Sequence, residues 1–417
     1  MSNPSQQHTD TDILVIGGGL VGASLACALA PLGLRITVVE AFELKTGGQP
    51  SYDDRTTALA YGSRRIFDAL GVWPEIEQRG ACAIKHIHIS DKGQFGFARL
   101  HASELDMDAL GYVAVNRVMG EALYARMQQL PGIDLVCPAT VEAVHKHADH
   151  ALCDIMQDGK PKQLSAKLVV MADGGRSGLR EALGFEFTKK DYRQTAVIAS
   201  VACSAPHNHT AYERFTQTGP LAVLPLYNGR VGIVWTTTPE QLDTILGWSD
   251  DTFIAELQQR FGQRLGRFSE PGSRASYPLY LTQLKQHYRD RVLLVGNAAH
   301  AVHPVGGQGF NLGLRDVAAL AEVIADAVRH DRDYGSDALL AEYMQWRERD
   351  NKRVSQFTDS MIRIFANDLP GLTFGRNLAL NIVDLLPPVK RAFTRRTSGL
   401  NGRLPRLSRG LPLRIKA

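Results

Sequence analysis

Cysteine is scarce in this chain, and the cysteines present are too scattered to form a covalent or metal framework. They are Cys27, Cys82, Cys137, Cys153 and Cys203, an odd number without a CxxC pair. This spacing argues against disulfides and against a zinc site, and it is typical of proteins in a reducing compartment. We therefore expect a cytoplasmic protein that has neither feature.

Internal repeats, low-complexity segments and an unusual composition are also missing. Hydrophobic residues make up 44% and charged residues 22%, close to the averages for soluble globular proteins, so the composition excludes a fibrous or disordered chain. At roughly 150 residues per domain, the 417 residues predict two or three units. No Ser/His/Asp set, carboxylate pair or metal-ligand spacing stands out. Spacing alone therefore assigns no catalytic residue.

Acidic residues are absent from residues 389–417, which hold nine lysines and arginines. Because the whole chain carries a net charge of only +4, the rest of it is mildly acidic. Aliphatic residues are interleaved with the basic ones, a pattern that suits an anionic membrane surface at least as well as a nucleic acid. We expect no nucleic-acid partner. The basic tail, residues 401–417, is expected either to contact a membrane or to be solvated and partly disordered.

One long hydrophobic run near the N-terminus resembles a membrane span. Residues 13–34 are uncharged and long enough to cross a bilayer. However, the run contains three consecutive glycines and a proline, and acidic residues precede it where a signal peptide would be basic. It divides better into a buried strand at 12–17 and a helix at 20–30, followed by a second strand at 34–40.

The turn between the first strand and the helix carries a GxGxxG pattern. Its glycines, Gly17, Gly19 and Gly22, permit a tight turn, a close approach of the backbone to a pyrophosphate and close packing of helix on strand. Glu40 ends the second strand, where it can accept hydrogen bonds from adenosine ribose hydroxyls. Strand, helix and acid together favour a dinucleotide-binding unit over glycines that serve only a tight turn.

The remaining pattern predicts an α/β fold of two interleaved domains. We expect a Rossmann-like dinucleotide-binding domain, an inserted substrate domain with a mixed or antiparallel sheet, and a helical C-terminal region. Buried-strand patterns at 167–172 and 291–296 mark the first domain, and alternating patterns mark the second. The predicted segments are 10–75, 105–185 and 285–355 for the first domain, 80–100 and 190–280 for the second, 356–400 for the helical region and 401–417 for the tail.

Two glycine turns follow the later buried strands. Asp173 lies in an Asp-Gly turn, either on the ligand side of the sheet or simply capping the next helix. The second turn, residues 296–313, has four glycines within 306–313, where a helical pattern begins, which suggests a backbone cradle at a helix N-terminus that would stabilise negative charge. His300 and His303 lie in it without a third ligand at suitable spacing. We expect no metal, and a structural or cofactor-adjacent role for both.

These motifs together resemble the flavoprotein aromatic hydroxylases of the p-hydroxybenzoate hydroxylase type, and among them the ubiquinone-biosynthesis branch. The resemblance implies a non-covalently bound FAD, with its ADP half at Gly17–Gly22 and Glu40. It extends over nearly the whole chain and stops near residue 401. Besides the GxGxxG unit, it covers residues 54–60, 116–117, 172–177, 213–225 and 303–313.

The resemblance also implies roles for individual residues. Arg55 and Arg117 would contact the cofactor, Asp173 would belong to a motif shared by FAD and nicotinamide binding, Gly296 and Asn297 would hold the ribityl chain, and Gly306, Gly307, Gly309 and Asn311 would lie beside the ring. For Arg55, the sequence alone favours an ion pair with Asp53 or Asp54. Most of the superfamily has Gly-Asp where this chain has Gly-Asn. The amide still hydrogen-bonds a hydroxyl but removes a charge, which fits the ubiquinone branch.

The implied activity is a monooxygenase reaction. NAD(P)H would reduce the flavin, O2 would add at C4a, and the hydroperoxide would hydroxylate the ring of a polyprenylated methoxyphenol in ubiquinone biosynthesis. A deprotonating group would help, and Tyr212 and His303 are only guesses for it. The alternatives are a sister hydroxylase acting at another ring position, a flavin-dependent reductase or halogenase, and a non-catalytic flavin-bound assembly subunit.

The implied substrate is very lipophilic. It would place the enzyme peripherally at a membrane or in a ubiquinone-biosynthesis complex, with the basic tail and the apolar residues of 369–386 as contact regions. The oligomeric state stays open.

Overall fold

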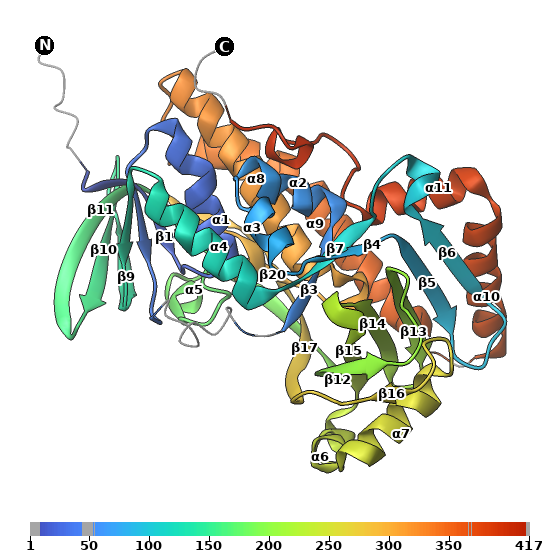
Figure 1. Cartoon of the computed structure of the whole chain (residues 1–417). Helices are drawn as coiled ribbons and strands as arrows, with labels where there is room; N and C mark the ends of the chain where they lie inside the picture. Colours follow the sequence, from blue (N-terminus) through green and yellow to red (C-terminus); the bar gives the residue numbers. More distant parts are fainter. Residues whose placement is uncertain (1–8, 44–52, 54, 366, 368, 414–417) are drawn as a thin grey trace, which may run out of the picture.

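The computed structural model describes residues 9–43, 53, 55–365, 367 and 369–413. Within these residues the strands form three sheets (Figure 1). An eight-stranded sheet lies at one end of the molecule, a nine-stranded sheet lies at the other, and a three-stranded sheet lies between them. Chain segments distant in sequence therefore meet in the middle of the molecule.

The N-terminal strand, helix and strand form the centre of the eight-stranded sheet. Strand β1 (Thr11–Ile16) lies parallel to both of its neighbours, β2 (Ile36–Val39) and β11 (Lys160–Met171). Its residues are almost all aliphatic and buried, as in strands covered on both faces. Helix α1 (Leu20–Leu29) begins directly after the glycine turn and packs into the main core. The predicted βαβ unit is confirmed.

Further strands widen this sheet in both directions. The parallel strands β8 (Ile133–Val136) and β19 (Val292–Leu294) pair with β2 and β11. Antiparallel strands β9 (Ala139–Lys146), β10 (Ala151–Gln157) and β18 (Tyr288–Arg289) complete the sheet. Because β1, β11 and β19 are parallel, the glycine turns that follow them lie along one edge of the sheet, which is the ligand edge of such folds.

The nine-stranded sheet is antiparallel except where β13 pairs with β5. Its strands are β5 (His86–Asp91), β6 (Phe97–His101), β12 (Phe187–Cys203), β13 (Thr210–Thr216), β14 (Gly219–Pro225), β15 (Arg230–Thr237), β16 (Phe268–Ser269), β17 (Ala275–Leu284) and β20 (His300–Ala301). One face packs on α6 (Pro239–Gly247) and α7 (Asp250–Phe261) through an aromatic core that includes Trp235 and Phe253. The other face is left for the site.

The three-stranded sheet joins β3 (Thr56–Ala60), β7 (Gly111–Val115) and β4 (Cys82–Ile84). Its presence divides the segment 80–100, which is predicted to belong to the substrate domain, between two sheets. Ile84 ends β4, and the chain then passes into β5 of the nine-stranded sheet. Helices α2 (Tyr61–Ala69), α3 (Trp73–Gln78) and α4 (Asn116–Gln129) surround this sheet (Figure 1).

Four helices follow the last glycine turn: α8 (Gln308–Arg329), α9 (Asp337–Phe365), α10 (Pro370–Leu385) and α11 (Pro387–Thr397). Pro370 and Pro387 are the first residues of α10 and α11, where the missing N–H costs nothing. Helix α9 runs without interruption across residues 355 and 356, where the sequence predicts the boundary between the first domain and the helical region. None of the helices in the described part of the chain is long and apolar enough to cross a membrane. The α/β class with a helical C-terminal region is confirmed.

The segment after α11 folds back onto the first domain as far as residue 413. Leu407 is 2% exposed in a short 3₁₀ helix beside α2. The backbone N–H of Arg406 donates to Glu322 Oε2 at 2.7 Å, and Trp346 Nε1 donates to the Arg403 carbonyl at 3.0 Å. A wholly solvated tail is therefore wrong for 401–413, because Leu407 is buried in the core and the segment bonds to the first domain, which composition does not reveal. Residues 414–417 of the predicted tail lie outside the described residues.

Candidate active site

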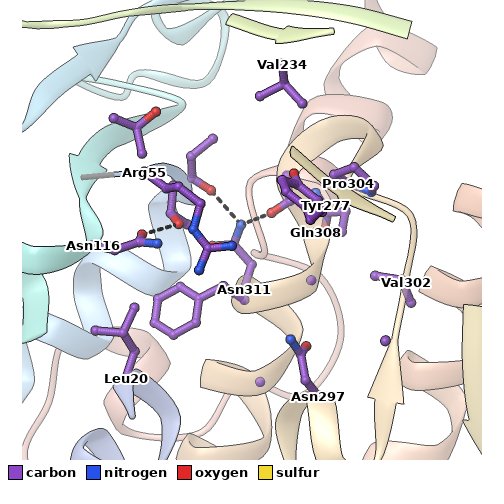
Figure 2. A pocket seen from close by; sticks show the side chains of 18 of the residues that line it. Leu20, Arg55, Asn116, Val234, Tyr277, Asn297, Val302, Pro304, Gln308 and Asn311 are labelled. Carbon is purple, nitrogen blue, oxygen red and sulfur yellow. Dashed lines mark hydrogen bonds between the residues drawn. The ribbon is translucent and has the colours of Figure 1, made fainter. Parts of the chain in front are cut away.

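A cavity of about 1990 Å³ is lined by residues of all three sheets and of α8, α9 and α11. Pockets for a single drug-sized ligand usually measure about 300–1,000 Å³, so this cavity has room for a dinucleotide and a substrate together. Figure 2 shows Arg55, Asn116, Tyr277, Gln308 and Asn297 around the same space. The cavity brings together the glycine turns predicted from the sequence.

The N-terminus of α1 supplies one wall of this cavity. Gly17 has a φ of +100°, and a Cβ there would lie 2.8 Å from Asp173 Cα. At Gly22 a Cβ would lie 1.9 Å from the Gly17 carbonyl oxygen, so only glycine fits the first turn. Gly19 is the N-cap, and no side chain caps the helix there. The first N–H groups of α1 are thus left for an anionic ligand such as a pyrophosphate.

Two predicted carboxylates border the same end of the cavity, and both hold a glycine turn. Glu40 is 4% exposed, and its Oε2 accepts a 2.6 Å hydrogen bond from the Gly18 N–H. Asp173 accepts from the N–H groups of Gly175 and Ser177 at 3.1 and 3.0 Å. Asp173 therefore stabilises its own turn, as the simpler interpretation of that motif holds, and it also lines the cavity.

Arg55 forms the predicted ion pair and also lines the cavity, while its cofactor contact remains a prediction. Its Nε lies 2.5 Å from Asp53 Oδ2, which is the ion pair that the sequence alone favours. Both side chains nevertheless line the cavity, and the Arg55 guanidinium lies 5.9 Å from the centre of the Tyr277 ring. The ion pair holds Arg55 in place at the wall, so the two roles do not exclude each other.

Arg117 is not brought to the cavity. It lies on α4, its Nη1 contacts Glu121 Oε1 at 3.4 Å, and it is not among the residues that line the cavity. Its predicted cofactor contact remains a prediction. The preceding residue, Asn116, does line the cavity and donates from Nδ2 to Asp53 Oδ1 at 3.2 Å. Consecutive helical residues point about 100° apart, so the Arg117 side chain leaves α4 in a different direction from that of Asn116.

The loop after β19 crosses from one large sheet to the other. Gly296 has a φ of +59°, and a Cβ there would lie 3.2 Å from the side chain of Val21 on α1. Asn297 is exposed and lines the cavity (Figure 2). Three residues later, from His300, the loop pairs with β17 as β20. This crossing puts the predicted ribityl-binding pair between the two domains.

A buried carboxylate of α8 holds this loop in place through hydrogen bonds. Asp316 of α8 accepts from the Gly296 N–H at 3.1 Å, from His300 Nε2 at 2.6 Å and from Arg347 Nε of α9 at 2.8 Å. Burial alone would raise the pKa of Asp316, but the charges of His300 and Arg347 prevail and lower it. His300 is thus part of the support of the loop. No three His, Cys, Asp or Glu side chains gather as a metal site among the described residues.

The second half of the loop ends at the N-terminus of α8. Gly306 and Gly307 have φ values of +66° and +63°, and a Cβ on Gly307 would lie 3.1 Å from Ala58 Cβ of β3. No acidic side chain occupies the first turn of this 22-residue helix. Gly309, in that first turn, also lines the cavity. The helix therefore directs positive potential toward the cavity, as the sequence predicts.

Asn311 acts on the shape of this cradle. Its Oδ1 accepts from the Ala60 N–H at 2.8 Å, and its Nδ2 donates to the carbonyls of Ala58 and Gly307 (Figure 2). The side chain is 2% exposed, and both ends of its amide are bonded to backbone. Asn311 thus ties β3 to the helix N-terminus, which the sequence pattern did not reveal.

Of the two guesses for phenol activation, His303 does not fit. It is fully buried and is not among the lining residues; its ring meets Tyr192 edge-on at 5.2 Å, and burial lowers its pKa to about 4. Tyr212 is among the lining residues, but its ring packs edge-on against Phe261 of α7 at 5.2 Å. Its role as the deprotonating group remains a prediction.

Glu213, the next residue of β13, is the functional candidate that sequence reasoning missed. Among the described lining residues it is the one carboxylate contributed by the nine-stranded sheet. Burial raises its pKa to about 7, and the nearby backbone N–H of Gly306 acts in the opposite direction. It thus lies beside the predicted ring-binding cradle with a titration near neutral pH. A glutamate within an alternating, largely apolar strand is the signal that could have found it.

Beside Glu213 the cavity lining becomes apolar. We call this part the apolar arm; Ile87 of β5, Leu100 of β6, Met361 of α9 and Phe393 of α11 line it. The arm therefore lies between the edge of the nine-stranded sheet and the C-terminal helices. Its chemistry suits a hydrocarbon group.

Comparisons with known proteins agree with this geometry. A family model described as FAD binding domain matches residues 10–358. Ubiquinone hydroxylase UbiL of Rhodospirillum rubrum is 37% identical over 96% of this chain and 93% of its own. The 3-demethoxyubiquinol 3-hydroxylase of Escherichia coli is 31% identical over 94% of this chain and 99% of its own.

A solved structure shows the same fold. The p-nitrophenol 4-monooxygenase PnpA of Pseudomonas putida is similar with a TM-score of 0.77 and 20% identity, covering 94% of this chain and 98% of that one. The cradle at Gly22, which a Cβ would fill, and the uncapped N-terminus of α1 fit a dinucleotide pyrophosphate. The chain belongs to the FAD binding domain family and is an FAD-dependent monooxygenase.

Proposed function

We propose that this enzyme hydroxylates the aromatic ring of a polyprenylated phenol in ubiquinone biosynthesis. The observation that carries the proposal is the cavity, which runs from the glycine turns to an apolar arm lined by aliphatic and aromatic side chains. A ring placed next to Glu213 and Gly306 would leave a prenyl chain directed into that arm. Relatives named as ubiquinone hydroxylases support the same substrate class.

The ring position is the finer part of the proposal. The sequence resemblance favours a polyprenylated methoxyphenol, the substrate of 2-octaprenyl-6-methoxyphenol hydroxylase. The sister reaction, at the position on which the E. coli 3-demethoxyubiquinol 3-hydroxylase acts, is the second candidate, because that relative matches nearly the whole chain. The two candidates share the site and differ in which ring edge meets the cofactor.

Bound FAD, with NAD(P)H as electron donor, supplies the oxygen chemistry, and the protein supplies binding and orientation. Gly17, Gly19 and Glu40 would hold the ADP half, and Gly296 and Asn297 the ribityl chain. The N-terminus of α8 would stabilise negative charge on the ring beside Gly306 and Gly307. Loop and sheets together exclude water from the reacting centre.

Glu213 would accept the proton of the substrate hydroxyl. A phenol reacts faster with an electrophilic oxygen as its phenolate, so a base near its hydroxyl speeds the reaction. A carboxyl with a pKa of about 7 is ionised often enough at neutral pH to accept that proton. No other carboxylate of the described lining comes from the substrate-side sheet.

The test is turnover by the purified, FAD-loaded enzyme. With NADH or NADPH, each candidate phenol and ¹⁸O2, mass spectrometry is expected to find one labelled oxygen in the product of one substrate. Hydroxylation of the demethoxyquinol instead would select the sister reaction. A yellow protein that oxidises no NAD(P)H with either substrate would refute the proposal and indicate a flavin-bound assembly subunit.

A further inference from the structure

Helix α10 and the turn after it carry an unusual outer surface. Every exposed residue between 369 and 389 is apolar, glycine or proline. Figure 1 shows α10 at the outer edge of the molecule, beside β6. We call the large exposed side chains of this surface the α10 face: Leu369, Leu372, Phe374, Leu378, Ile382, Leu385, Leu386 and Val389, with exposures from 40% to 73%.

The helix has its polar side turned inward. Asn377 accepts from the Gly96 N–H at 2.7 Å, and Asp384 accepts from the Arg99 N–H at 2.8 Å. Between them, Asn381 accepts from the N–H of Phe97 at 3.2 Å. These side chains satisfy N–H groups of β6, the edge strand of the sheet, and of Gly96 directly before it. Because this edge needs polar partners, the apolar stripe of the helix is left pointing outward.

A buried ion pair holds the helix in this orientation. Arg376 Nε lies 2.8 Å from Asp91 Oδ2 of β5, and both side chains are at most 6% exposed. Asn377 Nδ2 donates to the same carboxylate at 3.1 Å. Rotation of α10 to bury its leucines would break this pair and leave two charges unpaired, so the outward apolar face is the stable arrangement.

The exposed charges of the described segment 369–413 have one sign. Asp384 is the one acidic residue between 369 and 417, and its side chain is 4% exposed. Arg391, Arg395 and Arg396 of α11 are exposed beside the face. A segment that carries an apolar stripe and exposed cations, without an exposed anion of its own, is complementary to a surface that offers acyl chains and anionic headgroups.

We propose that the α10 face docks this enzyme on an anionic phospholipid bilayer, with the leucines and Phe374 in the acyl boundary and the α11 arginines at the headgroups. The inner faces of α10 and α11 lie next to the apolar arm of the cavity. Val383 of α10 packs in the same clusters as Phe393, which lines the apolar arm. Docking therefore brings the apolar arm next to the lipid, and this last step rests on the proposed polyprenyl substrate.

Cosedimentation of the FAD-loaded, full-length protein with vesicles tests the docking without using turnover. The wild type is expected to bind vesicles of phosphatidylcholine with phosphatidylglycerol. The double variant Leu378→Gln/Leu385→Gln is expected to bind the same vesicles with an affinity at least roughly tenfold lower. Arg391→Gln/Arg395→Gln is expected to lose the gain from phosphatidylglycerol while retaining the binding to phosphatidylcholine alone. Both pairs are exposed, so folding is expected to be intact, as circular dichroism and flavin absorbance check.

Leu411→Gln is the matched control, because Leu411 is an exposed leucine of the basic tail, outside the α10 face. Vesicle binding that Leu411→Gln abolishes and the Leu378/Leu385 variant retains would overturn the proposal in favour of the tail. A wild-type dimer that the Leu378/Leu385 variant converts to a monomer, without vesicle binding, would assign the face to a second copy. Turnover of a phenol with a single isoprene unit, unchanged in the Leu378/Leu385 variant, keeps this test separate from that of the proposed function.

Discussion

Gly22 lies in the first turn of α1, directly against the carbonyl of Gly17. Substitution by alanine adds one carbon there and tests whether this turn binds the pyrophosphate. In Gly22→Ala the Cβ would lie 1.9 Å from that oxygen, so the turn must shift. Overpacking of this kind costs about 1–3 kcal/mol. We expect FAD binding to weaken by roughly tenfold to hundredfold, measured by quenching of flavin fluorescence. Gly375→Ala, where nothing lies within 4 Å of the added carbon, should bind FAD as the wild type does; an equal loss there would contradict the prediction.

The titration of Glu213 predicts how the rate of hydroxylation depends on pH. Its pKa is raised to about 7 by burial, so the carboxylate is protonated below that pH and ionised above it. Hydroxylation is therefore expected to rise as the pH passes 7, and Glu213→Gln should abolish this limb and lower kcat at high pH by about 10²-fold. NAD(P)H oxidation should continue, with hydrogen peroxide released in place of product.

The control for this prediction is Glu142→Gln, an exposed carboxylate of β9 that also lines the cavity. It should keep the pH profile of the wild type. If Glu213→Gln retains the rise near pH 7, another group accepts the phenol proton.

At the residue scale, the sequence predicts best what is local. The GxGxxG spacing and Glu40 lie within one βαβ unit, so chain order alone brings them together. The identification of Glu213 depends on its closeness to Gly306, which lies about ninety residues away in the chain, in the loop before α8, and no local pattern reports this closeness. Asn311 was rightly expected at the cradle, but its bonding to β3 depends on tertiary packing.

At the scale of secondary-structure elements, Asp316 holds α8 against α9. Its carboxylate joins the loop at Gly296, His300 and Arg347, all in the interior. Replacement by Asn leaves Arg347 with less compensating charge, and breaking a buried pair costs about 3–5 kcal/mol. We expect Asp316→Asn to lower the free energy of unfolding, measured by urea denaturation, by that amount. Asp326→Asn, on the surface, should lower it by about 0–1 kcal/mol.

The pH dependence of this contribution follows from the lowered pKa of Asp316. The unfolded carboxyl titrates near its ordinary value and the folded one below it. The stabilisation is therefore complete above the ordinary range and is lost as the pH falls through the folded pKa. Equal acid sensitivity of the wild type and Asp316→Asn would contradict this assignment.

The segment after α11 yields a second prediction for an element. Leu407 is 2% exposed against the first domain, and removal of such a side chain costs about 2–5 kcal/mol. Leu407→Ala should lower the thermal midpoint clearly. Leu411→Ala, at an exposed leucine four residues later, should stay within about 0.5 kcal/mol of the wild type. Similar midpoints for the two variants would mean that the segment does not contribute to the folded core.

At the element scale, strands and helices were predictable where one residue pattern extends through the element. β1 and α1 are examples, with aliphatic runs between glycines. The three-stranded sheet was missed because β4 and β5 are separated by one residue, Lys85, and continue the same alternation into different sheets. The packing of the tail was missed because basic charge dominates its composition, while a few leucines decide where it lies.

At the scale of the whole molecule, the cavity lies between the two large sheets and is lined by residues of both. This position predicts how FAD affects the stability of the fold. Lining residues come from the glycine turns, from the nine-stranded sheet and from the last helices, so FAD contacts segments that separate when the chain unfolds. A ligand that binds only the folded state at a hundredfold excess over its Kd adds about 2.7 kcal/mol. We expect FAD to raise the thermal midpoint of the wild type by several degrees and to protect the loop at 296–307 from proteolysis. In Gly22→Ala the same FAD concentration should give a much smaller shift, since the cradle no longer fits. A shift of equal size in both proteins would mean that the stabilising contacts of FAD do not involve the N-terminus of α1.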